Sequence, residues 1–292
     1  MTNLPTIGII GAGKVGSSLA RLWHEAGCDV CAVYSPQREH AEGLALLVRA
    51  EVANSALEVV QKSDLTLLTV PDDVIAPLAE DIANQLAGER LQNKAIIHTS
   101  GSRDRTALAT LADSGAMTGS LHPAFPFTDA EHIPQSLQGV AFAVEAQDVV
   151  LRDWLFALVA VLGGVVIDIP AGGKAQYHAA LVIASNYTVT LYAIAEKLLM
   201  QMGATTQTAN AALNPLMQAT VGNLREQGIP NALTGPLVRA DVGTLEAHMN
   251  ALADIDSRLL DVYSQLARLS YPMLDARGVD TDTIETLLKI QT

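Results

Sequence analysis

The feature that most constrains the fold is a short apolar run, residues 7–10, that leads into three closely spaced glycines. The run predicts a buried strand, and the residues after the third glycine follow helical periodicity. Gly11 permits a tight turn, Gly13 lets backbone N–H groups approach a pyrophosphate, and Gly16 lets the helix pack closely on the strand. We therefore expect a dinucleotide-binding turn with phosphates at the helix N-terminus, although a related domain that has lost its cofactor would keep the same glycines. The residues expected to contact the cofactor here are Gly11, Gly13, Lys14, Val15 and Gly16.

The composition bounds the class of protein. The chain has 292 residues, of which 49% are hydrophobic and 17% charged, so it can bury large cores and suits two domains better than one. A net charge of −13 and an isoelectric point near 4.8 argue against attraction to nucleic acid or to an anionic membrane. The longest apolar stretch, 154–169, is too short and too broken to span a bilayer. Because the first residues lead into a strand, we expect no signal peptide and a cytoplasmic protein.

Two cysteines, Cys28 and Cys31, form a lone Cys-x-x-Cys. They enter a predicted strand, 29–34, where their spacing places the side chains on opposite faces. A zinc site would need two further ligands, and the chain has no second cysteine pair. We interpret both cysteines as structural and expect no metal.

The end of the predicted strand 29–34 bears on the choice of cofactor. Proteins that bind NAD place an acidic residue there to hold the ribose 2′-hydroxyl. This chain has Ser35, with Arg38 three residues later, and that pair suits a 2′-phosphate. The sequence therefore favours NADP. NAD stays possible, because Arg38 can also be a solvated charge at a helix start.

Two further strands, 64–70 and 95–99, are predicted to end at the same edge of a parallel sheet. Ligands of such sheets bind at the carboxyl ends of the strands. His98 lies inside the second strand and is interpreted as a packed residue. The additional residues expected to contact the cofactor are Val70, Pro71, Asp72, Ser100 and Gly101.

His122 follows another predicted strand, 117–121, and begins a loop that contains two prolines and two phenylalanines. Histidine is the usual general acid or base near neutral pH. A His-Pro turn can equally be structural, so the sequence supports a catalytic and a structural role about equally.

The fold class follows from the order of these elements. Strands alternate with helices up to residue 169, which predicts an α/β fold with an N-terminal Rossmann-type doubly wound parallel sheet. From Lys174 onward no strand pattern recurs, and the sequence becomes rich in Ala and Leu. We predict a dinucleotide-binding domain over 1–170 and an all-helical substrate and dimerisation domain over 171–292.

Residues 174–203 predict one long helix that is apolar around most of its surface. Such a helix is buried or lies in an oligomer interface, so we expect a homodimer through the helical half. Lys174, His178 and Ser185 share one stripe on it, flanked by Tyr177 and Asn186. The stripe is either a satisfied structural network or the lining of a cleft, and we favour the cleft, with Lys174 and His178 in contact with solvent.

A second polar cluster lies between two predicted helices, 206–227 and 242–268. There Arg239 follows a Gly-Pro turn and precedes Asp241. Arg239 can bind a carboxylate or phosphate, or it can simply pair with Asp241. His248, further along, is interpreted as a packing or surface residue.

The chain resembles proteins that join a Rossmann-like domain to a helical domain of the DUF2520 group. The matching segments are residues 11–16, the His122-Pro123 loop, 174–186 and 234–241. This group is similar in turn to pyrroline-5-carboxylate reductase, ketopantoate reductase, β-hydroxyacid dehydrogenases and prephenate dehydrogenase. In β-hydroxyacid dehydrogenases a lysine polarises the substrate oxygen, and Lys174 matches it. His178 stands where that family has an asparagine. The His122-Pro123 loop resembles that of prephenate dehydrogenase, whose histidine is catalytic.

The residues and the resemblance together predict an NADP(H)-dependent oxidoreductase that acts on a small carbonyl, imine or hydroxy-acid metabolite. Lys174 would polarise the reacting oxygen, His122 or His178 would relay a proton, and Asn186 and Arg239 would bind the substrate. Two other classes stay open. One is an NADP-binding sensor without turnover, and the other is a structural dimer that binds no dinucleotide.

Overall fold

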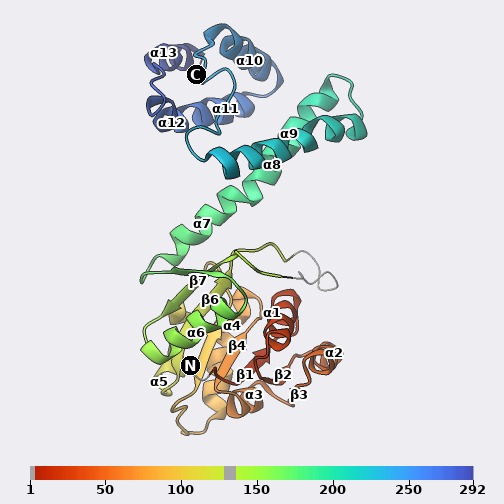
Figure 1. Cartoon of the computed structure of the whole chain (residues 1–292), viewed down its shortest axis with the longest axis vertical. Helices are drawn as coiled ribbons and strands as arrows, with labels where there is room; N and C mark the ends of the chain where they lie inside the picture. The colour runs from red at the N-terminus through yellow and green to blue at the C-terminus, as the bar shows by residue number, and fades with distance from the viewer. Residues whose placement is uncertain (1–3, 128–135, 292) are drawn as a thin grey trace. The chain divides into compact units, whose positions relative to one another are not determined.

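In the computed structural model, which describes residues 4–127 and 136–291, eight strands form one sheet in the order β3-β2-β1-β4-β5-β6-β7-β8 (Figure 1). The strands β1 to β6 are parallel, β7 is antiparallel to β6, and β8 is parallel to β7. The sheet is thus mostly parallel, which confirms the predicted fold class. The strands are β1 Ile7–Ile10, β2 Val30–Tyr34, β3 Glu51–Val52, β4 Leu65–Leu68, β5 Ala95–His98, β6 Met117–Pro123, β7 Ala141–Ala146 and β8 Val165–Asp168.

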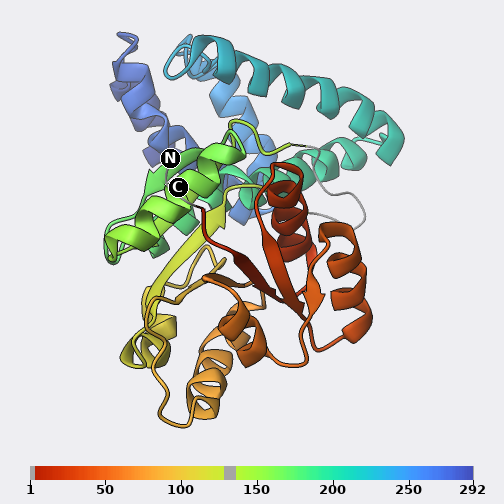
Figure 2. The same ribbon diagram turned by 60° about the horizontal axis from the view of Figure 1, so that its bottom comes forward.

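Helices cover both faces of this sheet (Figure 2). The helices α1 Lys14–Glu25, α2 Arg38–Val48 and α6 Val149–Val161 bury apolar side chains in one core on one face. The indole Nε1 of Trp23 in α1 donates to the carbonyl oxygen of Leu158 in α6, 3.1 Å away. The other face is covered by α3 Ala56–Lys62, α4 Asp72–Gln85, the short 3₁₀ helix η1 Arg105–Leu108 and α5 Ala109–Asp113.

The two cysteines contribute to these two cores. Cys28 belongs to the core on the α1 side, and Cys31 packs against the core on the α3 side. Both are free, and burial raises the pKa of each thiol. They therefore lie on opposite faces of the sheet, as their spacing predicts.

The rest of the chain is helical among the described residues. Ser185 separates α7 from α8 (φ −112°, ψ −68°), and the two helices together form the apolar helical stretch Lys174–Gln201 where the sequence predicts one helix over 174–203. Asp256 divides the expected helix 242–268 in the same way, because its extended backbone and its carboxylate cap α11. The helices are α7 Lys174–Ala184, α8 Asn186–Gln201, α9 Thr206–Gln227, α10 Val242–Ile255, α11 Ser257–Leu269, α12 Tyr271–Asp275 and α13 Asp282–Gln291.

By packing, the chain divides into two compact units, one ending at Thr188 and one beginning at Val189. The division lies within α8, after the change from sheet to helix that the sequence predicts. The first unit therefore contains the whole sheet together with α7. The second unit has its own apolar core, which includes Leu245, Met249, Leu274 and Ile284.

The stretch Lys174–Gln201 is unusual in its exposure. By length and composition alone it could cross a membrane, and none of its most apolar window is buried. Val189 is 68% exposed and Tyr187 is 56% exposed. This is the stretch for which the sequence predicts an oligomer interface.

Candidate functional site

The glycine turn joins β1 to α1, and two of its three glycines are required by close contacts. Gly11 has φ +106°, and a Cβ there would lie 2.6 Å from the carbonyl oxygen of Thr69. A Cβ on Gly16 would lie 2.2 Å from the carbonyl oxygen of Gly11, so neither position tolerates a side chain. Gly13 has open space around it and begins α1 without a side-chain cap. The turn thus leaves its outer side accessible at a helix N-terminus, which fits a bound pyrophosphate.

One detail of this turn differs from the expectation. Gly16 allows close contact with the turn itself and with Thr69 after β4, rather than with β1. The Thr69 hydroxyl donates to the carbonyl oxygen of Gly11 at 2.6 Å and holds the two loops together. Lys14 and Val15 are the first two residues of α1, so both lie at the helix N-terminus as expected.

The end of β2 is solvent-accessible. Ser35 is half-buried just after the strand, and Arg38 is exposed at the first position of α2. The Arg38 Nε lies 2.8 Å from Glu42 Oε1, with both side chains more than half exposed. An exposed pair of this kind contributes little to stability, so Arg38 is able to exchange Glu42 for a phosphate.

The loops after β4 and β5 meet through Asp72, the first residue of α4. Its Oδ2 accepts hydrogen bonds from the hydroxyls of Ser100 and Ser102, each at 2.8 Å. Burial alone would raise the pKa of Asp72, but these two hydroxyls and nearby positive charge outweigh it and lower the pKa. Val70 and Pro71 lead into the same helix N-terminus, and Pro71 is its N-cap. The structure therefore brings together the expected residues of both strand ends.

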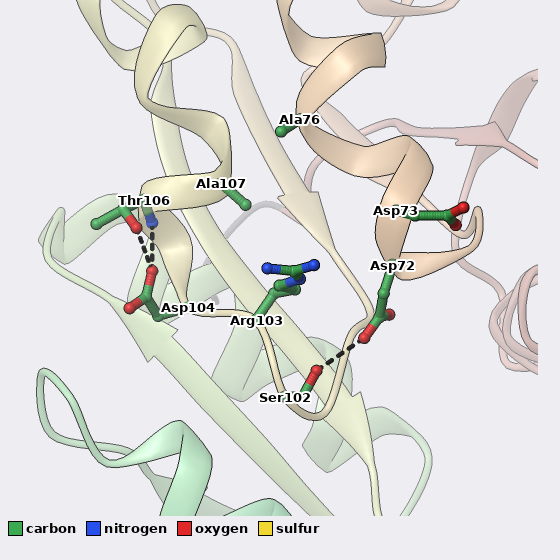
Figure 3. Close-up of a pocket in the computed structure, with 8 residues that line it drawn as sticks. All are labelled: Asp72, Asp73, Ala76, Ser102, Arg103, Asp104, Thr106 and Ala107. Carbon is green, nitrogen blue, oxygen red and sulfur yellow. Dashed lines mark hydrogen bonds between the residues drawn. The ribbon is translucent and has the colours of Figure 1, made fainter.

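A pocket of about 370 Å³ opens beside Asp72 (Figure 3). Arg103 extends across it between the start of α4 and η1. The Asp104 carboxylate accepts from the backbone N–H of Thr106 at 2.9 Å and caps η1.

Lys174 begins α7 and is buried, with 1% of its surface exposed. Its Nζ donates to the carbonyl oxygen of Ser100 at 2.8 Å. Burial lowers the pKa of Lys174 to about 8, although Glu145 and Asp72 act in the opposite direction. The expectation that Lys174 reaches solvent is wrong in this structure, because the loop after β5 covers the ammonium group.

His122 is the penultimate residue of β6 rather than the first residue after it. The strand continues to Pro123 because β7 pairs with it, with His122 opposite Ala143. Nδ1 of His122 lies 2.9 Å from the Tyr177 hydroxyl, and its ring lies edge-on to that of His178 with centroids 6.5 Å apart. The structure thus brings His122 and His178 together, 56 positions apart in the printed sequence.

These two histidines line a pocket of about 430 Å³ together with Asn186. Its walls are otherwise mostly apolar and come from the loop after β6 and from α7: Ala124, Phe125, Pro126, Leu181, Val182, Ala184 and Ser185. Gly101 borders the histidines, since a Cβ there would lie 2.9 Å from His122 Nε2 and 2.8 Å from His178 Cδ2. The predicted stripe on α7 therefore contributes to two places, with His178 and Ser185 in the pocket and Lys174 buried.

Arg239 lies in the second unit, exposed in the turn before α10. The carboxylate of Asp241 accepts from the backbone N–H and the hydroxyl of Thr244, at 3.2 and 2.8 Å, and caps α10. Asp241 thus has a structural role as the N-cap of α10. The assignment of Arg239 as a substrate anchor stays a prediction.

Sequence reasoning missed Glu145 and the hydrogen-bond partner of Tyr177. Glu145 on β7 is 5% exposed, and its Oε2 accepts from the backbone N–H of Arg105 at 2.9 Å. Burial raises the pKa of Glu145. Tyr177 was noted as a neighbour of the stripe but not as the partner of His122. An acidic residue inside an otherwise apolar strand was the available signal for Glu145, whereas nothing local pointed to the partner of Tyr177.

Among the residues that the structure describes, no group of three or more His, Cys, Asp or Glu side chains is placed to hold a metal ion. His98 is fully buried, with Nε2 3.0 Å from the carbonyl oxygen of Asp104, so it is a packed residue as expected.

Comparison with known proteins agrees with this architecture. A family model described as a Rossmann-like domain matches residues 3–123, and one described as a domain of unknown function, DUF2520, matches residues 140–270. No curated protein sequence matches the chain. Among solved structures, a candidate NADP oxidoreductase from Bacteroides fragilis is 26% identical, with a TM-score of 0.71 over 92% of this chain and 98% of that chain.

Two other solved structures share the fold at lower identity. An imine reductase from a Pseudomonas species is 16% identical, with a TM-score of 0.61 over 99% of this chain and 93% of that chain. A pyrroline-5-carboxylate reductase from Coxiella burnetii is 14% identical, with a TM-score of 0.60 over 94% and 98% of the two chains. The chain is therefore similar to a Rossmann-like domain over residues 3–123 and to the DUF2520 domain over residues 140–270, a range that includes β7 and β8 as well as α7 to α11.

Proposed function

We propose that the protein is an NADP(H)-dependent oxidoreductase that transfers hydride to or from a small carbonyl, imine or hydroxy-acid compound. The observation that carries this proposal is the position of the histidine pocket. It borders Gly101 in the loop after β5, on the sheet edge where the glycine turn and Asp72 also lie. A dinucleotide on the turn and a substrate in the pocket would thus share one edge. Likeness to a candidate NADP oxidoreductase supports the same conclusion.

The residues of the turn fit the proposed cofactor. The open side of Gly13 would admit the pyrophosphate, and Ser35 with Arg38 would hold a 2′-phosphate, so we favour NADP over NAD. The bound nicotinamide would supply or accept the hydride. Asp72, Ser100 and Gly101 would lie on its ribose side.

The pocket residues would bind and activate the substrate. His122 and His178 would interact with the reacting oxygen or nitrogen, and Asn186 would hydrogen-bond a polar group of the substrate. Because Lys174 is buried, it would act from behind the β5 loop, as a positive charge that also fixes Ser100. Arg239 would anchor an anionic group of the substrate.

We also propose that the protein is a cytoplasmic homodimer that associates through its helical half. In the single chain α8 has no buried residue, and Val189 and Leu216 are each more than 60% exposed. Exposed apolar surface of this extent favours association. Sedimentation velocity at micromolar concentration is expected to show a dimer, and Val189→Glu is expected to weaken it. A wild-type monomer would contradict the proposal.

The test of function has two steps. NADPH and NADH are titrated by fluorescence, and NADPH oxidation is then followed with a panel of small ketones, 2-oxo acids and cyclic imines. We expect tighter binding of NADPH and turnover of at least one compound. Tight NADPH binding without turnover across the panel would favour the sensor, and failure to bind either dinucleotide would favour a structural protein.

A further inference from the structure

The hydroxyl of Tyr177 and the imidazole of His122 form a hydrogen bond that links α7 to β6. The hydroxyl lies 2.9 Å from Nδ1, and the rings meet edge-to-face with centroids 5.7 Å apart. Within the described residues, Nδ1 is the only hydrogen-bond partner of this hydroxyl. Burial raises the pKa of Tyr177 to about 12, so the phenol keeps its proton and needs an acceptor. An O–H that donates to Nδ1 leaves the neutral ring with its proton on Nε2.

Nε2 of His122 lies beside Gly101, and His122 is one of the residues that line the pocket. A Cβ on Gly101 would lie 2.9 Å from this nitrogen, so any side chain at this position would crowd the ring. Among the residues that the structure describes, Nε2 has no hydrogen-bond partner. An N–H at this position is therefore available to a molecule in the pocket.

The groups around His122 keep the ring neutral. Burial is the largest of the causes that lower the pKa of His122 to about 4, and Lys174, His178 and His98 act in the same direction. Asp72 at the start of α4 acts weakly in the opposite direction. Near pH 7 the ring thus carries one proton, on Nδ1 or on Nε2.

We propose that Tyr177 is a positioning residue that holds the proton of His122 on Nε2, so that His122 is a neutral hydrogen-bond donor to the substrate's C=O or C=N group. The choice of substrate group rests on the proposed function, whereas the His122–Tyr177 contact does not. If the proposed nicotinamide supplies a hydride to the carbon, the π electron pair would move onto the oxygen or nitrogen, where the Nε2–H would stabilise it. That atom then takes its proton from water, and His122 keeps its own.

The test is NMR of the full-length protein with ¹⁵N-labelled histidine, between pH 6 and pH 8 (roughly the range around the ordinary histidine pKa). The His122 signals are assigned as those missing from His122→Gln. We expect Nδ1 to resonate as an unprotonated nitrogen and Nε2 as a protonated one, with no titration. A proton on Nδ1, or a ring that titrates near pH 6.5, would overturn the proposal.

Tyr177→Phe is expected to shift the His122 nitrogens toward a mixture of both tautomers, because the phenol no longer favours one. Tyr187→Phe, which alters an exposed tyrosine on α8, serves as the matched control and should leave the signals unchanged. Unchanged His122 signals in Tyr177→Phe would show that the phenol does not set the tautomer.

These spectra need neither cofactor nor turnover, so the two proposals fail separately. The expected tautomer in a protein without NADPH turnover would overturn the proposed function alone. Turnover with the proton on Nδ1 would overturn the positioning role alone. In an active enzyme, Tyr177→Phe should lower kcat about tenfold and leave the Kd for NADPH unchanged. An unchanged kcat would contradict the positioning role.

Discussion

The glycine turn and the histidine pocket lie on the same edge of the sheet but are built in opposite ways. The turn is local, since Gly11, Gly13 and Gly16 lie within six consecutive positions and the carbonyl oxygen that a Cβ on Gly16 would meet belongs to Gly11. The pocket joins the end of β6 to α7 through His122 and Tyr177, which are 55 positions apart. A local site can be recognised as a motif, whereas a site formed by distant segments exists only once the sheet has formed. The two sites should therefore respond differently to mutation.

The largest effect is expected at the turn. Gly16→Ala would place a Cβ 2.2 Å from the carbonyl oxygen of Gly11, and the resulting strain should cost on the order of 3 kcal/mol of unfolding free energy. Gly16→Ala should also lose NADPH binding. Gly13→Ala is the matched control, because that position is open, and it should weaken NADPH binding without loss of stability. Urea denaturation measures the stability of each variant, and fluorescence titration measures its affinity for NADPH. Equal stability of the two variants would show that Gly16 is under no greater steric constraint than Gly13.

The pocket should instead lose rate while it keeps its fold. His122→Asn should lower kcat about a hundredfold, because its amide cannot reach the position of Nε2. The longer amide of His122→Gln places an N–H near that position and should retain most of the activity. Steady-state kinetics at saturating NADPH compares the two variants. Equal losses in both would point to a protonated imidazole as the active species.

Lys174 should affect stability in a pH-dependent way. Its pKa is about 8 in the folded protein and about 10.5 when unfolded, so between these values the unfolded chain binds more protons. Stability should therefore rise with pH, by roughly 2 kcal/mol between pH 8 and pH 10 from this group. Urea denaturation of Lys174→Met should lack this contribution. An identical pH dependence in wild type and Lys174→Met would mean that Lys174 is solvated in solution.

Arg38 should produce the smallest effect. Arg38→Ala removes the cation at the end of β2 and should weaken NADPH binding about tenfold while NADH binding stays the same. The paired Glu42 is exposed, so stability should not change measurably. Fluorescence titration with NADPH and with NADH measures both affinities. A wild-type preference for NADH would contradict the 2′-phosphate assignment at Ser35 and Arg38.

The sequence by itself determined the parts of this protein that depend on neighbours along the chain. Three glycines, an apolar run and a helical period established the turn, the order of strands and helices, and the family resemblance, because φ preference and side-chain periodicity are local properties. The residues at the ends of β4 and β5 were also predictable, since parallel strands end at a common edge.

The tertiary structure decided what depends on distant contacts. It placed the Lys174 ammonium under the β5 loop, extended β6 through His122 by pairing with β7, and brought Tyr177 to Nδ1 of that ring. None of these follows from residue type or spacing, because burial and hydrogen-bond partners are set by segments that are far apart in the chain. The sequence around Lys174 is compatible with an ammonium group in water and with one bonded to a carbonyl oxygen. The packing of the β5 loop decides between the two.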